Sequence, residues 1–219
     1  GVAVSIVAYE AGSLLKKKYH SALLNPLLLS VAATIVILIL FHIDYDTYYE
    51  GAKYLSYLLT PATVCLAIPL YKQLELLRQH LIAVASAIVA GVAGSVGSIY
   101  VMCRFFQLEH THYVTLLPKS ITTAIGMGVS EEAGGIVTLT VISIIITGIL
   151  GNIIADWLFQ IFKIEEPIAK GLALGTAAHA IGTAKALELG EIEGAMSSLS
   201  IAVAGLLTVV VVPLMSGLI

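Results

Sequence analysis

The sequence predicts an all-α, polytopic membrane protein with about six spanning helices and two short re-entrant or broken segments. Hydrophobic residues make up 58% of the 219-residue chain and charged residues only 11%, whereas soluble domains carry about 25% charged residues. The apolar residues form uncharged runs, and several approach the roughly 20 residues that a helix needs to cross a bilayer. We expect one domain over residues 1–219. The formal net charge of −3 gives no indication of nucleic-acid binding.

Six apolar runs are the candidate spans. Three lysines follow the first run. We expect an acidic, tyrosine-rich loop at 44–50 after the second run, since tyrosine side chains suit the membrane interface. The third has Pro61 near its middle. The fourth has a glycine at every third position from Gly91 to Gly97, which would let a neighbouring helix approach closely. The runs cover residues 1–15, 21–43, 54–71, 81–103, 135–155 and 194–219.

Two further segments, 116–128 and 172–187, mix polar and apolar residues and are too short to span. Between Lys170 and Lys185 lie roughly 14 uncharged residues, which as helix would reach about 21 Å against a hydrocarbon core of about 30 Å. Irregular backbone at that depth is tolerated only where it is buried in protein or lines a wet cavity. The positive charges of the short loops all lie on one side of the membrane if both short segments are re-entrant. The two segments would then enter the membrane from opposite faces.

Oppositely inserted short segments are typical of transporters built from inverted repeats. Residues 23–26 (Leu-Leu-Asn-Pro) resemble residues 116–119 (Leu-Leu-Pro-Lys), which suggests repeat boundaries at these two points. A match of four residues also arises by chance, so both alternatives stay open.

The first candidate substrate-binding residues lie in segment 116–128: Lys119, with Ser120, Thr122 and Thr123 beside it. A lysine at membrane depth normally faces a cavity or a partner, and an anionic substrate would supply that partner. Each hydroxyl can donate one hydrogen bond to a carboxylate. The alternative is a lysine that extends to the interface from a shallow helix.

His179 is the candidate of the second short segment. Gly175 and Gly182 thin the helix on either side of it, so we expect His179 to bind a carboxylate or carry a proton, with Thr183 offering a further hydroxyl. The alternative is a buried histidine whose hydrogen bonds are satisfied inside the protein.

Prolines mark the remaining candidates. Pro61 frees a backbone carbonyl in its helix, so Thr60 and Thr63 beside it could meet a ligand. The alternative is a packed proline kink. Asn25 precedes Pro26 and is a further candidate, although asparagine before proline is also a common helix start.

Enzymatic chemistry finds little support in the chain. No nucleophile–base pair, paired carboxylate or phosphate-binding loop stands out, and no cysteine–histidine cluster has zinc-ligand spacing. We therefore expect neither an enzyme nor a cofactor.

Several motifs closely resemble those of the LrgB/CidB family. The longest is PIAKGLALGTAAHAIGTAKALE at 167–188, followed by GAMS at 194–197, and Lys185 is its one mild departure, where arginine is expected. Shorter matches are LNPL at 24–27, YYEG at 48–51, PATV at 61–64, AIPLYK at 67–72 and PKSITT at 118–123. Together they extend over nearly the whole chain.

The resemblance implies a multi-pass protein of the bacterial inner membrane, encoded beside a holin-like LrgA/CidA-type partner. The family is described as antiholin- or holin-like and linked to murein hydrolase control and cell lysis. It is also similar to the LrgB-like half of the plant plastidal glycolate/glycerate translocator, and some bacterial relatives are associated with pyruvate.

Two functional hypotheses follow. The first is a transporter of small monocarboxylates such as pyruvate, lactate, glycolate or glycerate, working by alternating access. The second is an antiholin- or holin-like regulator of murein hydrolase activity and lysis that acts with an LrgA/CidA-type partner. A homodimer is expected under either hypothesis, because dimers are the commonest oligomers.

Overall fold

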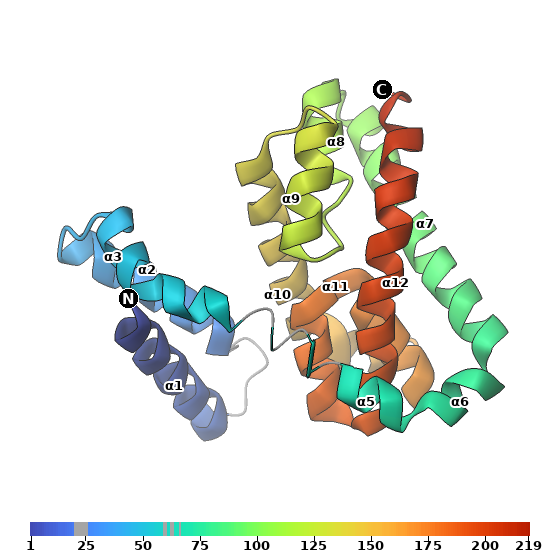
Figure 1. Ribbon diagram of the computed structural model, residues 1–219, viewed down its shortest axis with the longest axis horizontal. Coiled ribbons are helices and arrows are strands. Elements are labelled where there is room, and N and C mark those ends of the chain that lie inside the picture. The colour runs from blue at the N-terminus through green and yellow to red at the C-terminus, as the bar shows by residue number, and fades with distance from the viewer. Residues whose placement is uncertain (20–25, 59–60, 62–63, 66) are drawn as a thin grey trace. The chain divides into compact units, whose positions relative to one another are not determined.

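The computed structural model describes the chain except for residues 20–25, 59–60, 62–63 and 66 (Figure 1). The described residues are helical, and none of them forms a strand, so the predicted all-α class is confirmed. They fall into two compact units, Gly1–Leu66 and Ala67–Ile219.

The first unit contains α1 (Val2–Tyr19), α2 (Pro26–Leu40) and α3 (Tyr45–Tyr57). Helix α1 packs closely on α2, since a Cβ added to Gly12 would lie 2.9 Å from the Pro26 carbonyl oxygen. The predicted acidic loop at 44–50 is wrong, because α3 begins at Tyr45. Stacking of Tyr45 on Tyr49, with ring centroids 5.8 Å apart, accompanies its first turns, as expected for side chains four residues apart on a helix.

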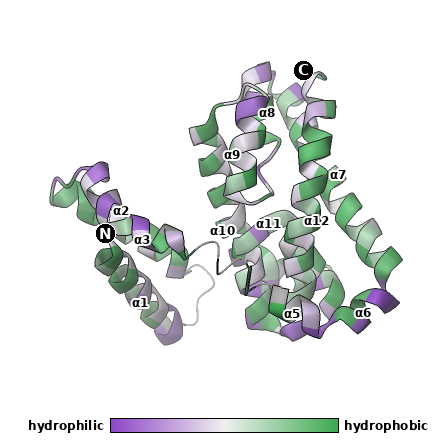
Figure 2. Ribbon diagram, in the orientation of Figure 1, coloured by the Kyte–Doolittle hydropathy of each residue, from purple (hydrophilic) through white to green (hydrophobic). Residues whose placement is uncertain are grey.

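Three helices of the second unit are long and apolar enough to cross a membrane: α7 (Leu81–Phe105), α10 (Val137–Ile161) and α12 (Glu191–Ser216). They confirm that the runs at 81–103, 135–155 and 194–219 form long apolar helices, as expected for spans. Figure 2 shows their ribbons as mainly apolar, with hydrophilic residues gathered at helix ends and connections.

The span expected at 54–71 is not one helix in the described residues. Helix α3 ends at Tyr57, Leu58 lies in a turn, and the short α5 (Ala67–Lys72) and α6 (Leu74–Gln79) follow. Among the described helices outside the second unit, only the 15-residue α2 is strongly apolar, and it is shorter than a span. Length and composition therefore identify three candidate spans in the described part of the chain, and the runs expected at 21–43 and 54–71 each include residues outside that part.

Helix α11 (Pro167–Leu189) consists of two arms, 167–178 and 180–189. The backbone of His179, with φ 41° and ψ −134°, is not helical. The arms fold back on each other, because a Cβ added to Gly182 would contact the carbonyl oxygen of Leu174. Leu174 and Ala186 also share one buried cluster, although a straight helix would hold them about 18 Å apart. The expected broken segment is therefore a helical hairpin with His179 at its tip.

A second hairpin is formed by α8 (His110–Leu116) and α9 (Thr123–Glu132), with residues 117–122 as its tip. Buried hydroxyls join this hairpin to the start of α10. The Thr140 hydroxyl lies 2.7 Å from Ser130 Oγ and 2.9 Å from the Thr115 carbonyl oxygen, and the Thr115 hydroxyl accepts a hydrogen bond from the Ile136 amide at 2.8 Å. These bonds hold the end of α9 and the start of α10 against α8, as the broken segment at 116–128 requires.

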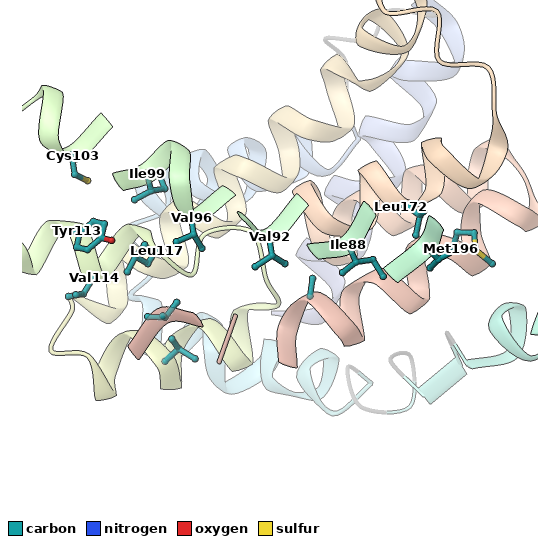
Figure 3. Packing of buried hydrophobic residues seen from close by; sticks show 14 of the residues in the cluster. Ile88, Val92, Val96, Ile99, Cys103, Tyr113, Val114, Leu117, Leu172 and Met196 are labelled. Atoms are coloured by element: carbon teal, nitrogen blue, oxygen red, sulfur yellow. The ribbon is translucent and has the colours of Figure 1, made fainter. Parts of the chain in front are cut away.

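The core of the second unit fixes where these hairpins lie. One face of α7 carries Val84, Ile88, Val92, Val96, Ile99 and Cys103 at intervals of three or four residues, which is the spacing of a helix face. Figure 3 shows this face extending from the α8–α9 hairpin, at Tyr113 and Leu117, to α11 and α12, at Leu172 and Met196. Helix α7 therefore connects the two hairpins along its length.

Candidate functional site

Lys119 and Ser120 lie in the tip of the α8–α9 hairpin and meet Ser95, which lies midway along α7. The Lys119 Nζ atom is 3.0 Å from Ser120 Oγ and 3.4 Å from Ser95 Oγ. The Ser95 hydroxyl donates to Ser120 Oγ at 2.9 Å. The three side chains therefore form one hydrogen-bonded cluster.

This cluster lies on a cavity of about 680 Å³ between α7, α10, the first arm of α11 and the α8–α9 tip. Most of the wall consists of small residues, among them Gly91, Gly94 and Gly151. Lys119 is the charged residue of the lining. The polar lining residues are Ser95, Ser98, Lys119, Ser120, Thr147 and Thr176.

The charge of Lys119 is not neutralised within the described part of the chain. Ion pairs of that part include Lys53 with Glu50, Lys72 with Glu191 and Lys185 with Asp156, and none is described for Lys119. Lys119 is half-buried, and a charge withdrawn from water without a partner is unfavourable. An anion is the species that this end of the cavity could accommodate.

His179 lies at the tip of the α11 hairpin and is only 3% exposed. Its Nε2 atom is 2.9 Å from the Ile144 carbonyl oxygen in the middle of α10. The carbonyl can only accept, so Nε2 carries the hydrogen.

Small residues make room for this tip. A Cβ added to Gly148 would lie 2.8 Å from His179 Cε1, and one added to Gly151 would lie 2.6 Å from Ala178 Cβ. Substitution at either glycine would force the α11 tip away from α10.

The second arm of α11 is bonded to both of its neighbours. Lys185 pairs with Asp156 of α10 at 2.7 Å, and the Asn152 side chain donates to the Ile181 carbonyl oxygen at 3.2 Å. On the other side, the Thr183 and Ser197 hydroxyls lie 2.7 Å apart. This arm is thus fixed by polar contacts, whereas the first arm faces the cavity.

The sequence-predicted residues are only partly brought together. Lys119 and Ser120 line the cavity. His179 and Thr183 are buried behind it, and Thr122 and Thr123 lie at the start of α9, so these four are outside the cavity lining. Asn25, Thr60 and Thr63 lie outside the described residues.

Sequence reasoning missed Ser95, Thr147 and Thr176 as lining residues. Ser95 lies between Gly94 and Gly97, and that glycine pattern was attributed to helix packing alone. Thr147 lies inside a long apolar run with no neighbouring charge. A hydroxyl in such a run usually bonds to its own helix, so nothing in the sequence distinguishes a serine or threonine that lines a cavity from one that does not.

Comparisons with known proteins agree on one family. The LrgB-like family model matches residues 5–218. The chain is 39% identical over 217 residues to the antiholin-like protein LrgB of Bacillus mycoides (strain KBAB4), covering 98% of this chain and 94% of that protein. Antiholin-like LrgB proteins of Bacillus cereus (strain B4264) and Bacillus anthracis (strain CDC 684 / NRRL 3495) give the same identity and coverage. No solved structure matches.

Proposed function

The chain belongs to the LrgB-like family, and on that premise we propose that it is an antiholin-like, multi-pass protein of a bacterial inner membrane. The observation that carries this proposal is the 39% identity, over 98% of the chain, to proteins named antiholin-like protein LrgB. The family and the three long apolar helices support a membrane location. The names of these relatives favour the antiholin-like hypothesis over the transport hypothesis.

An antiholin-like protein would act through a partner, and we propose an LrgA/CidA-type holin-like membrane protein in that role. The chain should be expressed in bacteria together with such a protein. We expect delayed lysis and lower murein hydrolase activity than with the partner alone. Unchanged lysis and hydrolase activity, with the chain inserted in the membrane at normal levels, would contradict the proposal.

The second candidate function is transport of small monocarboxylates such as pyruvate, lactate, glycolate or glycerate. One specific observation favours it: a half-buried lysine, without a carboxylate partner among the described residues, on a cavity of about 680 Å³. A protein that only assembles with a partner has no need of a cation in such a position, because intramembrane charges are unfavourable unless they bind something.

The two hairpins suggest how such transport would proceed. The α8–α9 tip carries Lys119, and the α11 tip carries His179, whose side chain is hydrogen-bonded to α10. Displacing one tip at a time would expose the cavity alternately to the two sides of the membrane, as inverted-repeat transporters do. We propose no catalytic step and no cofactor.

Transport is tested by uptake of labelled pyruvate and glycolate into proteoliposomes. We expect flux above that of empty vesicles, loss of flux in Lys119→Ala, and normal flux in Lys163→Ala, whose exposed lysine lies outside the cavity lining. Absence of flux under every proton or sodium gradient would refute this candidate. Light scattering of the purified protein tests the proposed homodimer.

A further inference from the structure

We propose that Ser95 is a specificity-determining residue of the cavity, and that Ser95, Lys119 and Ser120 together bind a single carboxylate of a singly charged anion. This inference rests on the second candidate function and deepens it. It assigns a role to a side chain of α7, outside both hairpins.

The side chains of Lys119, Ser95 and Ser120 together have more hydrogen-bond donors than the cluster uses. The Lys119 ammonium has three N–H donors, and each of the two serine hydroxyls has one O–H donor. Three of these donors are used inside the cluster: Lys119 donates to both serine oxygens, and Ser95 donates to Ser120. One ammonium N–H and the Ser120 O–H therefore have no acceptor in the described part of the protein.

These two spare donors start from atoms only 3.0 Å apart, and both residues line the cavity. Two neighbouring donors and one positive charge match a carboxylate, which has two acceptor oxygens and one negative charge. The two spare donors and the single charge are therefore enough for one carboxylate group and no more.

Ser95 determines this arrangement because it accepts from one member of the cluster and donates to the other. The Ser95 oxygen accepts one N–H of Lys119, which holds that N–H away from the ligand. The Ser95 hydroxyl donates to the Ser120 oxygen, so the Ser120 hydrogen stays free to point into the cavity. Ser95 is thus a positioning residue that acts through Lys119 and Ser120.

The rest of the lining limits the charge of the ligand. The remaining polar groups of the wall are neutral hydroxyls, and the other lining residues are apolar or glycine. A second carboxylate would have no cation to pair with, and burying it unpaired is strongly unfavourable. Anions with one carboxylate and a short uncharged body are therefore expected to bind, and dicarboxylates are not.

Ser86 offers a matched control, since it lies on α7 but is exposed and outside the cavity lining. Its hydroxyl donates to the Ala83 carbonyl oxygen of its own helix, at 3.0 Å. Removing it should leave the cluster intact.

The test is calorimetric binding to the full-length protein in detergent, with lactate, its neutral amide lactamide, and malate, which adds a second carboxylate. We expect lactate to bind at least about tenfold more tightly than either analogue, as one lost charge-assisted hydrogen bond implies. Ser95→Ala should weaken lactate binding about tenfold, Ser95→Thr should restore it, and Ser86→Ala should leave it unchanged, all with unaltered melting temperatures.

The inference is overturned if wild-type protein does not bind lactate, if malate or lactamide binds as tightly as lactate, or if Ser95→Ala binds like the wild type. Binding and flux separate this inference from the transport proposal. Selective, Ser95-dependent binding without flux would refute transport and support the site. Flux that is indifferent to Ser95→Ala would support transport and refute the site.

Discussion

The imidazole of His179 is hydrogen-bonded to the backbone carbonyl oxygen of Ile144, with 2.9 Å between Nε2 and the oxygen. A loop tip is thus bonded to the middle of a long helix. The same Ile144 also reaches the other hairpin, because a Cβ added to Gly126 of α9 would lie 2.6 Å from Ile144 Cδ1. Ile144 therefore lies between the two hairpins, and its carbonyl fixes the position of one of them.

The backbone of His179 predicts an unusual order of stability among its variants. Its φ of 41° favours glycine, and holding another residue in such a region costs roughly 1–3 kcal/mol. His179→Ala keeps that cost and loses the hydrogen bond to Ile144, whereas His179→Gly loses the bond but relieves the strain. We expect the glycine variant to be more stable than the alanine variant by about 1 kcal/mol.

Thermal unfolding in detergent checks this order, followed by a thiol-reactive dye that reports exposure of the buried Cys103 in a Cys65→Ser background. In a regular helix the order is reversed, because glycine is the poorer helix former. An alanine variant more stable than the glycine variant would therefore contradict the backbone conformation described for the α11 tip.

The glycines between α11 and α12 lead to a second prediction. A Cβ added to Gly175 would contact the carbonyl oxygen of Ser197, so Gly175→Ala must push the two helices apart. Overpacking of this kind typically costs roughly 1–3 kcal/mol. Gly128→Ala in α9, where an added Cβ meets nothing within 4 Å, is the matched control and should be neutral or slightly stabilising. Equal melting temperatures for the two variants would argue against the close packing of α11 on α12.

The sequence contained enough to predict the broken segments but not the contacts at their tips. Segments 116–128 and 172–187 could be identified because they are short, polar and rich in small residues, and a straight span cannot be built from them. The reversal of the chain at His179 could not be predicted from the sequence, because a positive φ at a non-glycine residue leaves no compositional signal.

Pairings between distant residues explain the other omissions. Ser95 approaches Lys119 across 24 residues, and Lys185 approaches Asp156 across 29. Which serine lines a cavity, and which carboxylate meets a lysine, depends on how the helices pack, and one sequence alone does not determine this.

The ion pair between Lys185 and Asp156 predicts an asymmetric response to mutation. The Lys185 side chain is only 13% exposed and that of Asp156 is 49% exposed. Asp156→Ala leaves a largely buried ammonium without this partner, whereas Lys185→Ala leaves a carboxylate that water can reach. We therefore expect Asp156→Ala to lower the melting temperature more than Lys185→Ala does, and the double variant to recover part of the loss. A double variant equal to the sum of the two single effects would show that the pair contributes no coupling energy.

The positive charge of Lys119 should be detectable from within the cavity by the rate of a charged thiol reagent. Gly94 lines the cavity, and an added Cβ there meets nothing within 4 Å, so Gly94→Cys in the Cys65→Ser background places a thiol in open space. Because a cationic cavity concentrates anions, we expect an anionic methanethiosulfonate to react faster than a cationic one, relative to their rates with a free thiol. Lys119→Ala should lower that ratio severalfold.

A cysteine at Gly128, which is exposed and outside the cavity lining, is the control, and its ratio of reaction rates should not depend on Lys119. If the ratio at Gly94→Cys is equally indifferent, the lysine charge does not act on the cavity, and neither carboxylate binding nor transport at this site can stand.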